Sequence, residues 1–135
     1  MNSTSMPVLA AAPADPLRIL VAEDEFLTRM LVSDHLREDG FVVLEAASGD
    51  EAIDILKSGA LIDLVFTDVQ MPGSHDGMAL LDFVKGAWPE LPVVMTSGHL
   101  ESALAYAGGA ADFLTKPCDL DIVANAIRTA LQVSA

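Results

Sequence analysis

An apolar run at residues 61–67 ends in a carboxylate, Asp68, and a segment with Pro72 and Gly73 follows directly. Short apolar runs without clean alternation are typical of strands that are buried on both faces of a parallel sheet. Such a strand would deliver Asp68 to its carboxyl end, just before a turn. Because ligands bind beyond the carboxyl ends of strands in open α/β sheets, this position predicts a layered α/β domain with a site at that edge.

Three further apolar runs also end in polar residues that are suited to binding metal or phosphate. These are Glu23, Asp24 and Glu25 after residues 18–22, Thr96 and Ser97 after residues 92–95, and Lys116 and Pro117 after residues 112–115. Carboxylates, a hydroxyl and an amine at one sheet edge indicate a phosphoryl-transfer site built around a divalent metal ion.

Strand-like and helix-like segments alternate five times along the chain. The predicted strands are residues 18–22, 41–46, 63–67, 92–96 and 112–115. Between them, apolar residues recur at the i, i+3, i+4 spacing of helices that bury one face. Alternating units of this kind imply a mostly parallel sheet with right-handed crossovers and helices on both faces.

The predicted helices carry signals of their own. The buried face of the first, which ends near Gly40, should hold Thr28, Leu31, Val32, His35 and Leu36. Ser48 followed by Glu51 is a capping-box pattern for the start of the second. The fourth, residues 101–107, is short and rich in alanine, and the fifth begins near Asp119.

The composition limits the kinds of partner. Seven basic and 20 acidic residues give a net charge of −13, which disfavours binding to nucleic acid or to anionic membranes. No apolar stretch approaches the roughly 20 residues of a membrane span. Cys118 is the only cysteine, so no intrachain disulfide can form. We therefore expect a cytoplasmic protein without a nucleic-acid partner or membrane insertion.

The first 16 residues differ from the rest, being rich in Ala, Ser and Pro without periodicity. We predict a flexible tail at residues 1–16 and one domain at residues 17–133. A signal peptide is the alternative, but its basic start is missing and the apolar segment is too short.

The acidic residues point to a metal ion. Glu23, Asp24 and Asp68 would repel one another and raise one another's pKa if they met at one sheet edge. A divalent cation would remove that conflict, with Asp24 and Asp68 as direct ligands of Mg²⁺ and Glu23 as a ligand through water. The alternative, that residues 23–25 only open a helix, does not explain Asp68.

The remaining strand ends could neutralise a phosphoryl group. Asp68 could act as the nucleophile and form an acyl phosphate. The Thr96 hydroxyl, the Ser97 backbone amide and the Lys116 ammonium could then contact the phosphoryl oxygens. A surface lysine closing a strand is the alternative for Lys116. A sharp turn there would favour a cis bond before Pro117.

The three histidines and the cysteine are weaker candidates. His99 alone is expected near the site, while His35 should lie on the inner face of the first helix and His75 in the loop at residues 73–77. Cys118 is expected to be a small, buried or half-buried side chain.

Residues 17–133 resemble the receiver domain of two-component response regulators. The resemblance rests on four segments taken together and in order, at residues 19–25, 68–73 with Asp76-Gly77, 92–97 and 109–117. It implies a flavodoxin-like (βα)5 doubly wound parallel sheet with strand order 2-1-3-4-5.

The resemblance also implies roles for individual residues. Asp68 would be the phosphoacceptor. Asp24, Asp68 and the backbone carbonyl of Gln70 would bind Mg²⁺ (or Mn²⁺), with Glu23 assisting through water. Thr96 and Lys116 would contact the phosphoryl group, and Thr96 and Phe113 would form the switch pair.

By the same resemblance, the chain would be a single-domain response regulator rather than an enzyme acting on an external metabolite. A sensor histidine kinase or a histidine phosphotransfer protein would supply the phosphoryl group, and an unknown downstream protein would bind the altered surface. We expect a monomer or weak homodimer. The loop after Asp68 is one residue longer than the common form, and Cys118 replaces a large apolar residue.

Two alternatives remain open. An α/β phosphatase with an aspartyl-phosphate intermediate would need a second acid and a lid, for which this chain has no insertion. A receiver-like interaction module that works without phosphate would not need the acids, Thr96 and Lys116.

Overall fold

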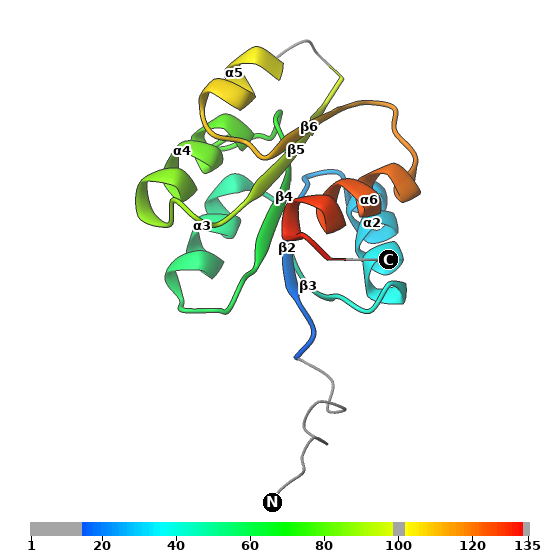
Figure 1. Ribbon diagram of the computed structural model, residues 1–135. Coiled ribbons are helices and arrows are strands. Elements are labelled where there is room, and N and C mark those ends of the chain that lie inside the picture. Colours follow the sequence, from blue (N-terminus) through cyan, green and yellow to red (C-terminus); the bar gives the residue numbers. More distant parts are fainter. Residues whose placement is uncertain (1–14, 99–101, 134–135) are drawn as a thin grey trace, which may run out of the picture.

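The computed structural model describes residues 15–98 and 102–133 (Figure 1). Five strands and five helices alternate along these residues. The strands are β2 (Arg18–Ala22), β3 (Val42–Ala46), β4 (Leu64–Asp68), β5 (Val93–Ser97) and β6 (Asp112–Thr115). The helices are α2 (Phe26–Glu38), α3 (Gly49–Lys57), α4 (Gly77–Ala87), α5 (Ser102–Ala107) and α6 (Leu120–Leu131). All five strands lie within about a residue of their predicted ranges.

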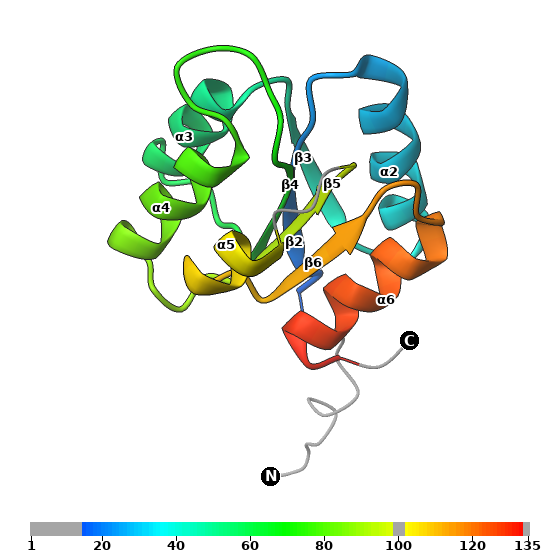
Figure 2. The same ribbon diagram turned by 90° about the horizontal axis from the view of Figure 1, so that it is seen from above.

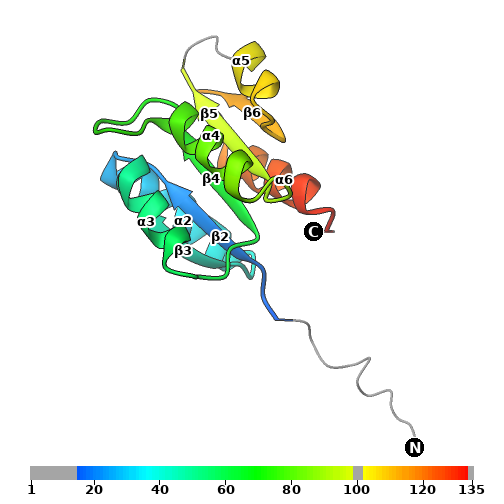
Figure 3. The ribbon, with the colours of Figure 1, turned by 90° about the vertical axis from the view of Figure 1, so that its left-hand side faces the viewer.

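All strands are parallel, in the order β3-β2-β4-β5-β6. This order confirms the predicted 2-1-3-4-5 arrangement. Helices α2 and α6 cover one face of the sheet, and α3, α4 and α5 cover the other (Figures 2 and 3). The carboxyl ends of the strands therefore share one edge, as the site prediction requires.

The two faces of β2 show why the strand sequences are apolar without alternating. Ile19 and Val21 pack in the core under α2 and α6, whereas Leu20 and Ala22 pack in the core under α3, α4 and α5. All four side chains are buried. Because both faces are covered, these four positions must be apolar, and polar residues are confined to the ends of the strand.

Local signals place the helix starts. The Ser48 side chain accepts a hydrogen bond from the Glu51 amide at 3.0 Å, and the Glu51 side chain accepts one from the Ala47 amide at 2.6 Å. This reciprocal cap confirms Ser48 as the N-cap of α3. Asp119 is the N-cap of α6, also as predicted.

One prediction for the first helix is wrong. Leu31 was expected on the buried face of α2, but 48% of it is exposed. Val32 and Leu36 alone of its predicted apolar face are buried, because the sheet contacts a narrower stripe of α2 than the i, i+3, i+4 pattern suggests.

Several predictions lie outside the described residues. They are the tail at residues 1–14, His99, and Glu101 as the start of the fourth helix. Within the described residues, none of the helices has both the length and the apolar character needed to cross a membrane.

Candidate functional site

Asp68 is the last residue of β4 and lies at the centre of the sheet's carboxyl edge. Only 6% of it is exposed. The register of β4 and β5 pairs Asp68 with Thr96, and the Val69 amide donates to the Thr96 carbonyl at 3.0 Å. The Lys116 amide donates to the Ser97 carbonyl at 2.8 Å, which brings the end of β6 to the same place. The parallel register therefore brings together three of the predicted strand ends.

The acidic residues after β2 complete the cluster. One carboxylate oxygen from each of Glu23, Asp24 and Asp68 lies within 4.8 Å of the others. Glu23 is buried, and its Oε2 atom accepts a hydrogen bond from the Glu25 amide at 3.0 Å. The structure thus brings together the three carboxylates that the sequence predicts as a metal site.

Arg29 on α2 holds the backbone of Glu23 in place, and the sequence analysis did not identify this residue. Its guanidinium donates to the Glu23 carbonyl at 2.8 Å, and its Nε atom lies 3.3 Å from Glu45 Oε1. Arg29 follows Asp24 by five positions, one turn into the helix that the acids open. A basic residue in the first turns of α2 could have been recognised as a partner for residues 23–25, because its side chain can reach back to them.

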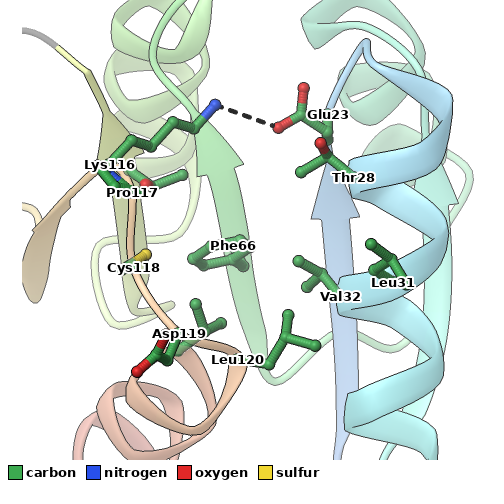
Figure 4. Close-up of a pocket in the computed structure, with 12 residues that line it drawn as sticks. Glu23, Thr28, Leu31, Val32, Phe66, Lys116, Pro117, Cys118, Asp119 and Leu120 are labelled. Carbon is green, nitrogen blue, oxygen red and sulfur yellow. Dashed lines mark ion pairs between the residues drawn. The ribbon is translucent and has the colours of Figure 1, made fainter.

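Lys116 balances part of the negative charge. Its Nζ atom lies 2.7 Å from Asp68 Oδ2 and 3.6 Å from Glu23 Oε1. Figure 4 shows the lysine reaching across the top of β4 toward Glu23. Burial alone would lower the pKa of Lys116, but the hydrogen bond to Asp68 and the two nearby carboxylates outweigh it, so the pKa is raised. The side chain is therefore a cation at neutral pH.

The same surroundings also raise the pKa of Glu23, but for a carboxyl group this shift disfavours the charged form. Burial raises the pKa of Glu23 by disfavouring its charged form, and the negative charge of Asp68 adds to this effect. The backbone hydrogen bond from Glu25 and the charge of Lys116 oppose it without cancelling it. The site therefore gathers three carboxyl groups around a single ammonium, that of Lys116.

Thr96 and Ser97 supply polar groups beside Asp68. Both residues are buried at the end of β5. The Thr96 hydroxyl oxygen has no hydrogen-bond partner among the described residues. A buried hydroxyl without a partner is costly and uncommon in native proteins. Thr96 therefore suits a ligand that carries acceptor oxygens.

These groups fit both a divalent cation and a phosphoryl group. Three carboxylates within reach of one another match the oxygen ligands that Mg²⁺ prefers. The hydroxyl of Thr96 and the ammonium of Lys116 match the oxygens of a phosphoryl group. The structure brings all of them close to the carboxylate of Asp68.

The remaining predicted residues lie around this centre. Gln70 is exposed, and its amide donates to Asp68 Oδ1 at 3.3 Å. Phe113 is buried in the core that α3, α4 and α5 cover. The peptide bond between Lys116 and Pro117 is cis. Cys118 is half-buried, as expected.

Two of the histidines have acidic partners that sequence reasoning did not identify. His35 on α2 lies 3.2 Å from Asp121 on α6, and His75 lies 2.5 Å from Asp50 on α3. Both pairs join elements that are far apart in the chain. The pattern of a single element gave no signal for either of them.

A groove of about 640 Å³ opens beside the site, between α2 and the segment that joins β6 to α6. Figure 4 shows its two walls, with Leu31 and Val32 on one side and Cys118 and Leu120 on the other. Its upper end is formed by Glu23 and Lys116. An apolar surface therefore leads directly to the polar cluster.

Comparisons with known proteins agree with this geometry. The family model described as the response regulator receiver domain matches residues 19–128. A solved structure, the receiver domain of NtrX from Brucella abortus, is 40% identical with a TM-score of 0.78, and the match covers 86% of this chain and 99% of that one.

Curated relatives are longer proteins. The nitrogen assimilation regulatory protein NtrX of Azorhizobium caulinodans is 38% identical over 107 residues, which cover 76% of this chain. The sensor kinase CckA of Brucella abortus is 36% identical over 118 residues, which cover 84% of this chain. The matched part spans only 23% of the first relative and 12% of the second.

Proposed function

The chain belongs to the response regulator receiver domain family of two-component systems, and we propose that it accepts a phosphoryl group on Asp68. The donor would be a phosphohistidine of a sensor histidine kinase or of a histidine phosphotransfer protein. The observation that carries this proposal is the convergence of Glu23, Asp24 and Lys116 on Asp68 at one sheet edge. The acceptor itself would be modified, without turnover of an external metabolite.

In the proposed reaction, a carboxylate oxygen of Asp68 attacks the phosphorus atom of the donor. A new O–P bond forms while the P–N bond to the donor imidazole breaks. The electron pair of that bond stays on the imidazole nitrogen, which then takes up a proton from solvent. The product is an acyl phosphate on Asp68.

The carboxylates of Glu23, Asp24 and Asp68, with the Gln70 carbonyl, would hold Mg²⁺. The ion would supply positive charge that offsets the charge of the phosphoryl oxygens. The close approach of the three carboxylates supports this assignment, because like charges at such distances need a cation.

The chain's own donors would neutralise the rest of the phosphoryl charge. The Lys116 ammonium, now 2.7 Å from Asp68 Oδ2, would pair with one oxygen. The Thr96 hydroxyl, which has no hydrogen-bond partner among the described residues, would donate to another. We assign the Ser97 amide to the same oxygens, since Ser97 directly follows Thr96 at the end of β5.

The signal would leave the domain through a change in its docking surface. Thr96 and Phe113 belong to adjacent strands, where Met95 and Phe113 are paired in register. A shift of the Thr96 hydroxyl toward the phosphoryl group would alter the packing against Phe113 and α5. Such a local charge event biases a two-state element, and a downstream protein would bind the favoured state.

The donor would dock on α2 beside the groove. Phe26, Leu27 and Leu31 on this helix are 65%, 52% and 48% exposed. Clustered apolar side chains that border a reactive site are typical of protein-binding surfaces. A donor placed there would present its phosphohistidine to Asp68 from the groove side.

The test is intact mass after incubation with Mg²⁺ and acetyl phosphate, on the wild type and on Asp68→Asn. The proposal expects the gain of one phosphoryl group in the wild type, and no gain in the variant or when Mg²⁺ is chelated. A gain that persists in Asp68→Asn would overturn the assignment of Asp68. If the wild type gains nothing from acetyl phosphate or from a phosphorylated phosphotransfer domain, the phosphate-independent alternative replaces this proposal.

A further inference from the structure

The loop between β4 and α4, residues 69–76, is flanked by contacts with Asp68: one at its start, and one from Gly77, the first residue of α4. At its start, the Gln70 amide donates to Asp68 Oδ1 at 3.3 Å. At its end, the Gly77 amide donates to the Val69 carbonyl at 2.7 Å. A β-carbon added to Gly77 would lie 2.1 Å from the Asp68 carbonyl oxygen, so the two backbones are in direct contact. The position of this loop therefore bears on the reactive carboxylate.

The middle of the loop is held by a residue of another element. Asp50, in the first turn of α3, accepts a hydrogen bond from the Ser74 amide at 3.3 Å through Oδ2. Its other oxygen, Oδ1, lies 2.5 Å from His75 Nδ1. Because a carboxylate can only accept, the imidazole must donate through Nδ1. We call Asp50, Ser74 and His75 the loop clasp.

The electrostatics of the loop clasp agree with its geometry. The hydrogen bond from His75 holds the pKa of Asp50 below its usual value, and the Ser74 amide adds to this effect. The charged form of Asp50 is therefore the form that the contacts stabilise. Both side chains of the pair are somewhat less than half exposed, so the contact remains open to solvent.

The loop also lies directly on the start of α3. A β-carbon added to Gly49 would come within 2.2 Å of the His75 carbonyl oxygen. Real β-carbons do not approach this closely, so any other residue at position 49 must push the loop away. Gly49 thus permits the close approach that places Asp50 under Ser74 and His75.

We propose that the loop clasp positions the Gln70 backbone, and through it Asp68, for metal binding and phosphoryl transfer. Asp50 and His75 are then positioning residues, since neither touches the reacting atoms. The chain of contacts runs from Asp50 to His75 and Ser74, along the loop to Gln70, and from the Gln70 amide to Asp68 Oδ1. This inference rests on the proposed function, because it assumes that Asp68 binds the metal ion and accepts the phosphoryl group.

The test measures Mg²⁺ binding by titration calorimetry and the phosphorylation rate with acetyl phosphate, on the full chain. Asp50→Asn and His75→Leu remove the pair in different ways. Each should weaken Mg²⁺ binding and slow phosphorylation by roughly two- to fivefold, the scale expected for a half-exposed polar pair. His75→Asn should retain nearly wild-type values, because the asparagine amide can donate from about the position of Nδ1.

Gly49→Ala gives a second, independent way to displace the loop. It leaves Asp50 and His75 intact but removes the space between α3 and the loop. The variant should show the same weakened Mg²⁺ binding, with faster hydrogen exchange at the Gln70 and Ser74 amides. Gly49→Ala changes no charge, so weaker Mg²⁺ binding in this variant would come from a displaced loop and not from the loss of an acidic group.

Two control variants make the result specific. Asp54→Asn removes an exposed acid one turn further along α3, and His35→Leu breaks the His35–Asp121 pair between α2 and α6. Neither should change Mg²⁺ binding. Wild-type Mg²⁺ affinity and rate in Asp50→Asn, His75→Leu and Gly49→Ala would overturn the loop-clasp proposal while leaving the proposed function intact. Failure of the wild type itself to bind Mg²⁺ or gain a phosphoryl group would instead overturn the proposed function.

Discussion

The ammonium nitrogen of Lys116 lies 2.7 Å from Asp68 Oδ2, although 48 positions separate the two residues in the chain. Their contact follows from the sheet order, because Asp68 ends β4, Lys116 directly follows β6, and only β5 lies between these two strands. In the proposed function the same ammonium must serve two partners. It pairs with the carboxylates now, and it would pair with phosphoryl oxygens after transfer.

Replacing Lys116 should therefore have opposite effects on metal binding and on transfer. In Lys116→Met, Asp68 and Glu23 lose a cation that competes with Mg²⁺ for their oxygens. Mg²⁺ should bind about threefold more tightly at low salt. Phosphorylation by acetyl phosphate should slow by roughly 100-fold, because one donor to the phosphoryl oxygens is gone. Titration calorimetry and intact mass measure the two quantities.

Lys57→Met is the matched control for this prediction. Lys57 ends α3, where its ammonium lies 5.7 Å from the Phe83 ring rather than beside a predicted site residue. Its loss changes the net charge equally and should leave both quantities nearly unchanged. Weaker Mg²⁺ binding in Lys116→Met would contradict the competition between lysine and metal.

Glu23 should destabilise the metal-free protein at neutral pH. Its pKa is raised, chiefly by burial, so the folded state holds its proton more tightly than the unfolded state does. The penalty is present above the raised pKa and is relieved as the pH falls through it toward the usual value of 4.5. Glu23→Gln should therefore raise the melting temperature in EDTA at pH 7 by about 2–5 °C.

The pH dependence distinguishes this cause from better packing. The advantage of Glu23→Gln over the wild type should shrink as the pH falls from 7 toward the usual pKa of 4.5, because the wild-type carboxyl takes up its proton above that pH. Calorimetry of both proteins in EDTA measures the difference. A difference that stays constant over this range would show that charge is not the cause. With Mg²⁺ present, the wild type should gain more stability than the variant.

Replacing Thr96 should preserve or raise the stability of the protein but slow its phosphorylation. Its hydroxyl is buried without a partner among the described residues, so Thr96→Val removes an unsatisfied group at nearly constant volume. The free energy of unfolding should stay equal or rise by about 1 kcal/mol. The phosphorylation rate should fall by roughly tenfold or more, since a donor to the phosphoryl group is lost.

Thr67→Val is the counterpart in the neighbouring strand. The Thr67 hydroxyl is also buried, but it donates to the Asp68 carbonyl at 2.9 Å. Losing a satisfied hydrogen bond should lower the free energy of unfolding by about 1 kcal/mol. Urea unfolding of both variants checks the contrast. Equal destabilisation by the two substitutions would mean that Thr96 is satisfied in solution.

The sequence predicted the strands and their polar ends well because that information is local. A strand buried on both faces is mostly apolar, and its polar residues gather near its ends. Asp68, Ser97 and Glu23 each lie within one residue of such an end. Parallel register then brings the ends together without any further sequence signal.

Contacts between elements could not be predicted from the sequence, and the reason is physical. Asp50 and His75 are 25 positions apart, and only the path of the β4–α4 loop over α3 makes them neighbours. Leu31 fits the helical period of a buried face, but the width of the contact between α2 and the sheet decides its exposure. Such features depend on packing geometry, which local patterns do not contain.

The exposure of Leu31 leads to the last prediction, which separates docking from chemistry. Leu31→Lys places a charge on the apolar wall of the groove beside α2. Transfer from a phosphotransfer domain that modifies the wild type should slow by roughly tenfold or more, since a charge buried in an apolar contact is costly. Modification by acetyl phosphate should not change, because a small donor needs no docking surface. Leu104→Lys changes a leucine of α5, on the other face of the sheet, that is 66% exposed against 48% for Leu31, and this variant should accept the phosphoryl group normally. Equal slowing with both donors would place the defect at Asp68 instead of at the docking surface.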